Sequence, residues 1–77
     1  MSRGLPRVTA DAVLRALGRD GWFISRQSGS HVILRHPDKS GRVVVPRHGG
    51  GKTLRLGTLA AVIESAGLTV DELWRLL

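Results

Sequence analysis

The 77-residue sequence has no cysteine, which excludes a disulfide framework and any cysteine-based zinc site. This absence is compatible with the reducing cytoplasm. No apolar run approaches the roughly 20 residues that a membrane-spanning helix needs. The stretch Met1–Arg7 carries basic residues but no apolar segment follows it, so we do not expect a signal peptide. We expect a soluble cytoplasmic protein with a single domain over residues 1–77, in which residues 1–7 form a loose lead-in.

Acidic residues are nearly missing from the middle of the chain. Between Gly21 and Ile63 the only acid is Asp38, whereas acids and cations balance in the two ends of the chain. The net charge of +6 therefore falls in this middle segment, whose cations are Arg26, Arg35, Lys39, Arg42, Arg47, Lys52 and Arg55. Such a segment is typical of a protein that binds a polyanion, although it can also be solvated charge that only maintains solubility. The lack of clustered carboxylates argues against a magnesium-dependent nuclease.

Apolar spacing predicts a helix near each end of the chain and a short third helix at the C-terminus. The first follows an N-cap at Thr9, and its apolar positions are Ala10, Val13, Leu14 and Leu17. The second follows a glycine-rich loop over Arg47–Gly57, and its apolar face is Leu59, Val62, Ile63 and Ala66. The third opens with a capping box from Thr69 to Glu72, and its apolar positions are Val70, Leu73, Trp74 and Leu77.

Three short strands are predicted between the first two helices, over Trp22–Gln27, His31–His36 and Arg42–Pro46. Their short linkers favour an antiparallel meander. The run Val43–Val45 is apolar on both faces, which suggests cover on each side or a partner. The fold class is therefore α+β, with the order α-β-β-β-α and a three-stranded antiparallel sheet backed by helices on one face. This order resembles the double-stranded-RNA-binding-domain fold, which does not by itself establish a function.

The histidines His31, His36 and His48 are the candidates for chemistry. RNA supplies its own nucleophile, the 2′-hydroxyl, so a protein needs only to move protons and stabilise negative charge, which imidazole and Arg or Lys can do. His31 begins a strand directly after Gly29 and Ser30, where a phosphate can approach the backbone and accept a hydrogen bond. A surface histidine without any function is the plainer alternative.

The other two histidines are weaker candidates. His48 lies near Lys52 in the glycine-rich loop and can supply a second donor, whereas His36 precedes Pro37 and is interpreted as a turn or edge residue. A zinc site made of all three histidines is disfavoured, because His31 and His36 are separated by an odd number of strand positions and should point to opposite faces.

Six short motifs are spread along the chain: Gly21-Trp22, Gly29-Ser30-His31, Arg35-His36-Pro37, Val45-Pro46-Arg47-His48-Gly49, Gly57-Thr58-Leu59 and Ala66-Gly67-Leu68. Together they resemble the HicA family of mRNA interferase toxins from bacterial type II toxin–antitoxin systems. The resemblance covers Val8 to Leu73 and implies a double-stranded-RNA-binding-like fold, RNA cleavage without a metal or other cofactor, and His31 as the catalytic residue. It also implies a HicB-like antitoxin that covers the active face. Compared with the family loop, the segment from His48 to Leu54 is one residue longer, with an additional glycine among residues 49–51.

The leading hypothesis from the sequence is a toxin that cleaves mRNA with His31 as general acid or base. The residues expected to bind RNA are Gly29, Ser30, Arg26, Arg35, Arg47, His48 and Lys52. One alternative is a non-catalytic RNA-binding module of the same fold, in which His31 only contacts the RNA. Another is an interaction protein whose basic face binds an acidic protein partner.

Overall fold

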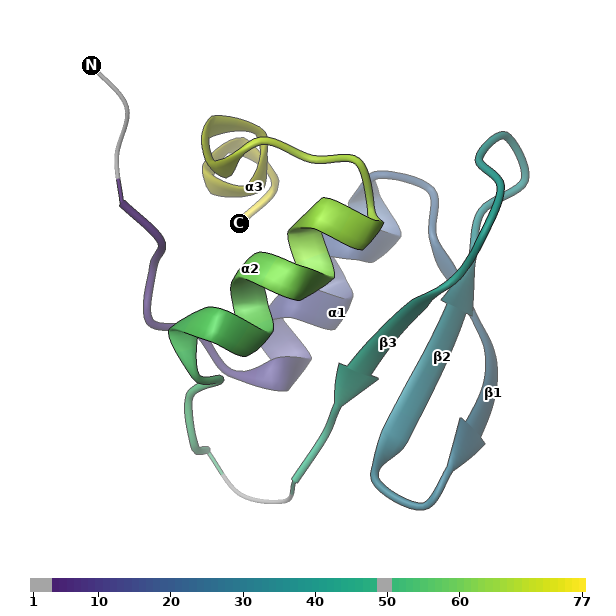
Figure 1. Ribbon diagram of the computed structural model, residues 1–77, viewed down its shortest axis with the longest axis horizontal. Helices are drawn as coiled ribbons and strands as arrows, with labels where there is room; N and C mark the ends of the chain where they lie inside the picture. Colours follow the sequence, from purple (N-terminus) through teal and green to yellow (C-terminus); the bar gives the residue numbers. More distant parts are fainter. Residues whose placement is uncertain (1–3, 49–50) are drawn as a thin grey trace.

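The structure is a computed structural model that describes residues 4–48 and 51–77. It consists of a three-stranded sheet with helices on one face (Figure 1). The elements, in order, are α1 (Ala10–Arg19), β1 (Phe23–Ser28), β2 (His31–Arg35), β3 (Val43–Pro46), α2 (Leu56–Ser65) and α3 (Val70–Leu76). The predicted α+β class, the three antiparallel strands and the double-stranded-RNA-binding-like order are confirmed. None of the helices in the described ranges is long and apolar enough to cross a membrane.

The sheet is the predicted meander, with the strand order β1-β2-β3 and antiparallel pairing throughout. The side chains of Val32 and Leu34 in β2 are buried in the core, as are those of Val43 and Val45 in β3. Because successive side chains of a strand point to opposite faces, the alternate positions of β2 face away from the helices. We call this second surface the open face of the sheet. It carries His31, Ile33 and Arg35 from β2, the residues paired with them in β1, namely Ser28, Arg26 and Phe23, and Pro46 and Val44 from β3.

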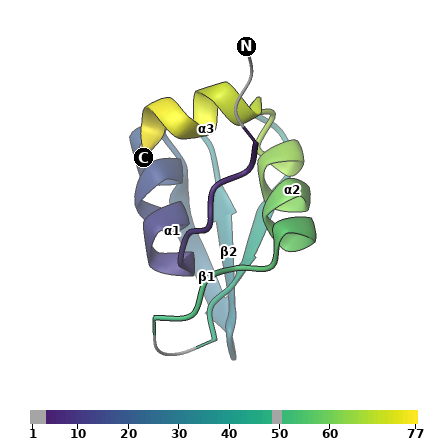
Figure 2. The same cartoon turned by 90° about the vertical axis from the view of Figure 1, so that its left-hand side faces the viewer.

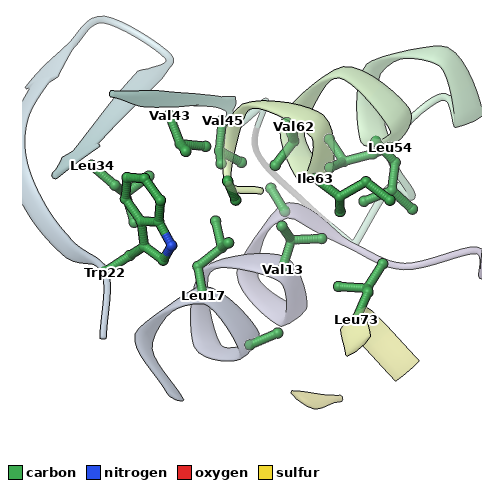
Figure 3. Close-up of a cluster of buried hydrophobic side chains, with 14 of the residues drawn as sticks. Val13, Leu17, Trp22, Leu34, Val43, Val45, Leu54, Val62, Ile63 and Leu73 are labelled. Carbon is green, nitrogen blue, oxygen red and sulfur yellow. The ribbon is translucent and has the colours of Figure 1, made fainter. Parts of the chain in front are cut away.

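Helices α1 and α2 lie side by side on the other face, and α3 lies across one end of them (Figure 2). The core between these layers is entirely apolar and includes Leu17 of α1, Leu59 of α2 and Leu73 of α3, all fully buried. Trp22 is also buried there (Figure 3). The predicted apolar face of α2 is confirmed, because all four of its residues are buried.

The helix ends follow local sequence signals. The Thr9 hydroxyl accepts a hydrogen bond from the Ala12 N–H (3.2 Å), and Thr69 and Glu72 form the predicted capping box. Helix α2 begins earlier than predicted, at Leu56, so Gly57 lies in its first turn and not in the loop. In α3 the side chain of Leu76, and not Leu77 as predicted, packs against the core.

The segment before α1 lies against the folded domain. Leu5 and Val8 pack against the core, and the Leu54 N–H donates to the Val8 carbonyl (2.8 Å). The indole N–H of Trp74 donates to the Gly4 carbonyl (2.8 Å). Of the predicted lead-in, residues 1–3 lie outside the described residues, as do Gly49 and Gly50 of the glycine-rich loop.

Candidate functional site

His31 is the first residue of β2 and lies in the middle of the three strands, on the open face. It is paired with Ser28 of β1 on one side and with Pro46 of β3 on the other, and it is exposed. Helices do not cover this face (Figure 2). The imidazole is therefore accessible to a polymeric ligand that lies across the sheet.

The turn before His31 is tied to the end of β3. Gly29 has a φ of +59°, a left-handed conformation that favours glycine, and a Cβ added there would meet nothing within 4 Å. The Arg47 N–H donates to the Ser30 carbonyl (2.6 Å), and the Gln27 side-chain amide donates to the Gly29 carbonyl (3.1 Å). The turn has open space above its backbone, and the loop that follows β3 lies at the same end of the sheet (Figure 1).

The two arginines predicted to contact RNA from the sheet differ in their relation to His31. Arg26 is paired with Ile33, two positions from His31, on the open face. Arg35 lies at the other end of β2, four residues from His31, which corresponds to about 13 Å along a strand. Its guanidinium donates to the Gly41 carbonyl (3.0 Å) in the turn between β2 and β3. The structure therefore brings Arg26 towards His31 and leaves Arg35 at a distance.

Three of the residues predicted to bind RNA, Arg47, His48 and Lys52, follow Pro46, the last residue of β3. Arg47 forms an ion pair with Asp11 of α1 (Nε to Oδ1, 2.8 Å), and both side chains are about half exposed. His48 and Lys52 line a cavity at the end of β3 together with Arg55. Neither Arg55 nor Asp11 has a local motif around it, so in the sequence Arg55 is only one cation among seven and Asp11 has no apparent role.

His36 has a structural position at the opposite end of the sheet from His31. Its Nδ1 accepts a hydrogen bond from the Asp38 N–H (3.0 Å), so the proton of the neutral ring is on Nε2, which lies 2.7 Å from the Asp20 carbonyl. The ring also packs edge-on against Trp22, with 5.2 Å between the ring centroids. The prediction of a turn or edge contact is confirmed, but the bond to Asp20 is not foreseeable from sequence spacing.

The charges around the sheet are only partly neutralised within the described residues. Lys39 forms an ion pair with Asp20 (2.9 Å), and the Arg47–Asp11 pair is the second one found in residues 4–48 and 51–77. The cations without an ion pair in this part of the chain include Arg26, Lys52 and Arg55. Nowhere in the same ranges do three potential metal-ligating side chains come together.

A family model described as the HicA toxin of bacterial toxin–antitoxin matches residues 10–68. The chain belongs to the HicA toxin family. The match runs from the start of α1 to Leu68 and so includes the whole sheet, His31 and the loop after β3. Membership of the HicA family implies a toxin with nuclease-like activity and an antitoxin partner. No curated protein matches the chain.

Proposed function

We propose that this HicA-family toxin is an endoribonuclease that cleaves mRNA without a metal, with His31 as general acid or base. The observation that supports this most is the position of His31, an exposed imidazole on the open face of a basic sheet. No helix separates it from a long RNA strand, and Arg26 shares its face. The HicA membership of the chain supports the nuclease character of this site.

The chemistry requires two proton transfers. The 2′-hydroxyl of RNA loses its proton as O2′ attacks the phosphorus atom, and the bond from phosphorus to O5′ breaks as O5′ takes up a proton. The products are a 2′,3′-cyclic phosphate and a 5′-hydroxyl. His31 carries out one of these transfers, since imidazole exchanges protons near neutral pH. His48 is the second histidine at this end of the sheet, and Arg26 and Lys52 stabilise the negative charge of the transition state.

The remaining RNA contacts follow from the same placement. Gly29 leaves room for a phosphate beside the turn, and Ser30 offers a hydroxyl. Arg47 contacts an RNA phosphate after its ion pair with Asp11 breaks. Arg35 binds the RNA backbone farther along the strand, away from the cleaved bond.

We also propose that a HicB-like antitoxin inhibits the toxin in the cytoplasm by covering the open face. Phe23 lies on this face and is 53% exposed, and Val44 is only half-buried there. Phe23 and Val44 are on the two outer strands of a face that also carries Arg26, which forms no ion pair within the described residues. A face with exposed apolar surface and an unpaired cation suits a protein partner that brings apolar and acidic side chains. This placement accounts for the apolar middle residue of the Val43–Val45 run.

The test is cleavage of a defined single-stranded RNA in excess EDTA, comparing the wild type with His31→Ala. Because His31 is exposed, the substitution should leave Tm unchanged while the cleavage rate falls by about 10²- to 10⁴-fold. The wild-type products should carry 2′,3′-cyclic phosphate ends. If neither protein cuts the RNA and both bind it tightly, the protein is a non-catalytic RNA-binding module. If RNA does not bind and affinity for an acidic protein changes little with salt, it is a protein-interaction domain.

A further inference from the structure

A cavity of about 440 Å³ opens where the N-terminal ends of α1 and α2 meet the end of β3. This volume lies within the range of about 300–1,000 Å³ that small-molecule sites occupy. Three of its lining residues are apolar: Ala10 at the start of α1, Leu54 before α2 and Pro46 at the end of β3. Ala10 and Leu54 are buried, so the cavity has an apolar wall that is continuous with the core.

The walls of this cavity are held in place by contacts between segments distant in the sequence. The Leu54 N–H donates to the Val8 carbonyl (2.8 Å), and Thr53 forms an isolated β-bridge with Thr9, the N-cap of α1. The Leu59 N–H donates to the Arg55 carbonyl (2.9 Å) and closes the first turn of α2. The residues from Thr53 to Arg55 are therefore positioned by the fold before any ligand binds.

The charged residues of the lining are both cations, Lys52 and Arg55, and no carboxylate lines the cavity within the described chain. The other polar groups of the lining are the imidazole of His48 and the hydroxyls of Thr53 and Thr58. Neither Lys52 nor Arg55 forms an ion pair in the described ranges. Arg55 and Thr58 belong to the start of α2, where the helix dipole also favours negative charge. Such a lining suits a phosphate.

The cavity is next to His31. Pro46 lines the cavity and is the residue directly opposite His31 in the pairing of β2 with β3, which corresponds to a Cα separation of about 5 Å. The Arg47 N–H also donates to the Ser30 carbonyl (2.6 Å), which joins the residue after β3 to the residue before β2. His31 is on the open face whereas the cavity is on the helix side of the sheet, so a chain bound at His31 reaches the cavity by passing around the end of β3.

From this arrangement we infer that the cavity binds one nucleotide of the RNA strand, adjacent to the phosphodiester at His31. The phosphate of this nucleotide contacts Lys52 and Arg55, and its base or ribose packs on the wall formed by Ala10, Pro46 and Leu54. The inference rests on the proposed ribonuclease function for the identity of the polymer, but the binding of a single nucleotide does not depend on cleavage. The cavity thereby sets the register of the RNA and favours particular bases beside the cleaved bond.

The experiment is a titration of the ¹⁵N-labelled wild-type protein with each of the four ribonucleoside 5′-monophosphates and, separately, with inorganic phosphate, followed by NMR. Amide shifts should concentrate on Ala10 and on Lys52–Thr58, and at least one nucleotide should bind about tenfold more tightly than phosphate. Replacing both cations, Lys52→Gln and Arg55→Gln, should weaken nucleotide binding by about tenfold or more, since one charged hydrogen bond corresponds to about that factor. The matched control, Arg15→Gln, removes an exposed cation of α1 and should change the affinity by less than about twofold.

The inference is overturned if the shifts map elsewhere, if phosphate binds as tightly as every nucleotide, or if Arg15→Gln weakens binding as much as the cavity variants. The outcome is separable from that of the cleavage test. A protein that binds nucleotides in the cavity but does not cut RNA keeps this inference and loses the proposed activity. A protein that cuts RNA but binds no nucleotide at Lys52 and Arg55 keeps the proposed activity and loses this inference.

Discussion

Among the described glycines, Gly21 is the one where an added methyl group should have the largest effect on stability. It follows α1 with a φ of +102°, and a Cβ built there would lie 2.6 Å from Nε2 of His36. Gly21→Ala therefore costs about 1–2 kcal/mol for the backbone conformation. It also displaces an imidazole ring that Asp20 and Asp38 hold from both sides. Loss of these two hydrogen bonds adds about 1–3 kcal/mol.

Together these terms give a loss of about 2–5 kcal/mol, which lowers Tm by at least about 8 °C in a domain of this size. The assay is thermal unfolding followed by circular dichroism. Gly29→Ala is the matched control, because the alanine would also have to adopt a positive φ (+59°) but its Cβ would meet nothing within 4 Å. It should therefore cost only the free energy of the backbone conformation.

A double-mutant cycle with His36→Ala isolates the contact. Without the ring, Gly21→Ala should cost about as much as Gly29→Ala, since only the conformational term remains. The reasoning is refuted if Gly21→Ala has the same effect on stability in the presence and the absence of His36.

Three further predictions address the site, the core and the third helix. Asp11→Asn removes the carboxylate that pairs with Arg47, so RNA affinity measured by fluorescence anisotropy should rise severalfold at low salt with little change in Tm; an unchanged Kd would contradict the proposed role of Arg47. Ile63→Ala should cost roughly 2–5 kcal/mol, because the side chain is only 6% exposed, and a Tm equal to that of the wild type would contradict this packing. The hydrogen bond from the Thr69 backbone N–H lowers the pKa of Glu72 below its ordinary value of 4.5. The ionised Glu72 side chain therefore stabilises the fold above pH 4.5, and this stabilisation is lost as the pH falls through the lowered pKa. On acidification the Tm of Glu72→Gln should therefore fall less than that of the wild type, and an equal fall would exclude a stabilising role of the Glu72 carboxylate.

The local sequence determined most of the fold. Apolar periodicity identified the helices, the side chain of Thr9 and the capping box at Thr69 identified where two of them begin, and short polar linkers identified the meander. These signals depend on residues within about four positions of one another, so they can be read without knowing the rest of the structure. His31 became the candidate for chemistry in the same way, from a short motif at the start of a strand.

The tertiary structure decided which of the candidate residues lie together. The Arg47–Asp11 ion pair joins the residue after β3 to α1, and the hydrogen bond between the His36 ring and the Asp20 carbonyl joins the end of β2 to the end of α1. The cavity is assembled from Ala10, Pro46 and the residues before and at the start of α2, which belong to segments far apart in the sequence. Such contacts depend on how helices and strands pack, and a sequence pattern with a period of two or 3.6 residues contains no information about distances between elements.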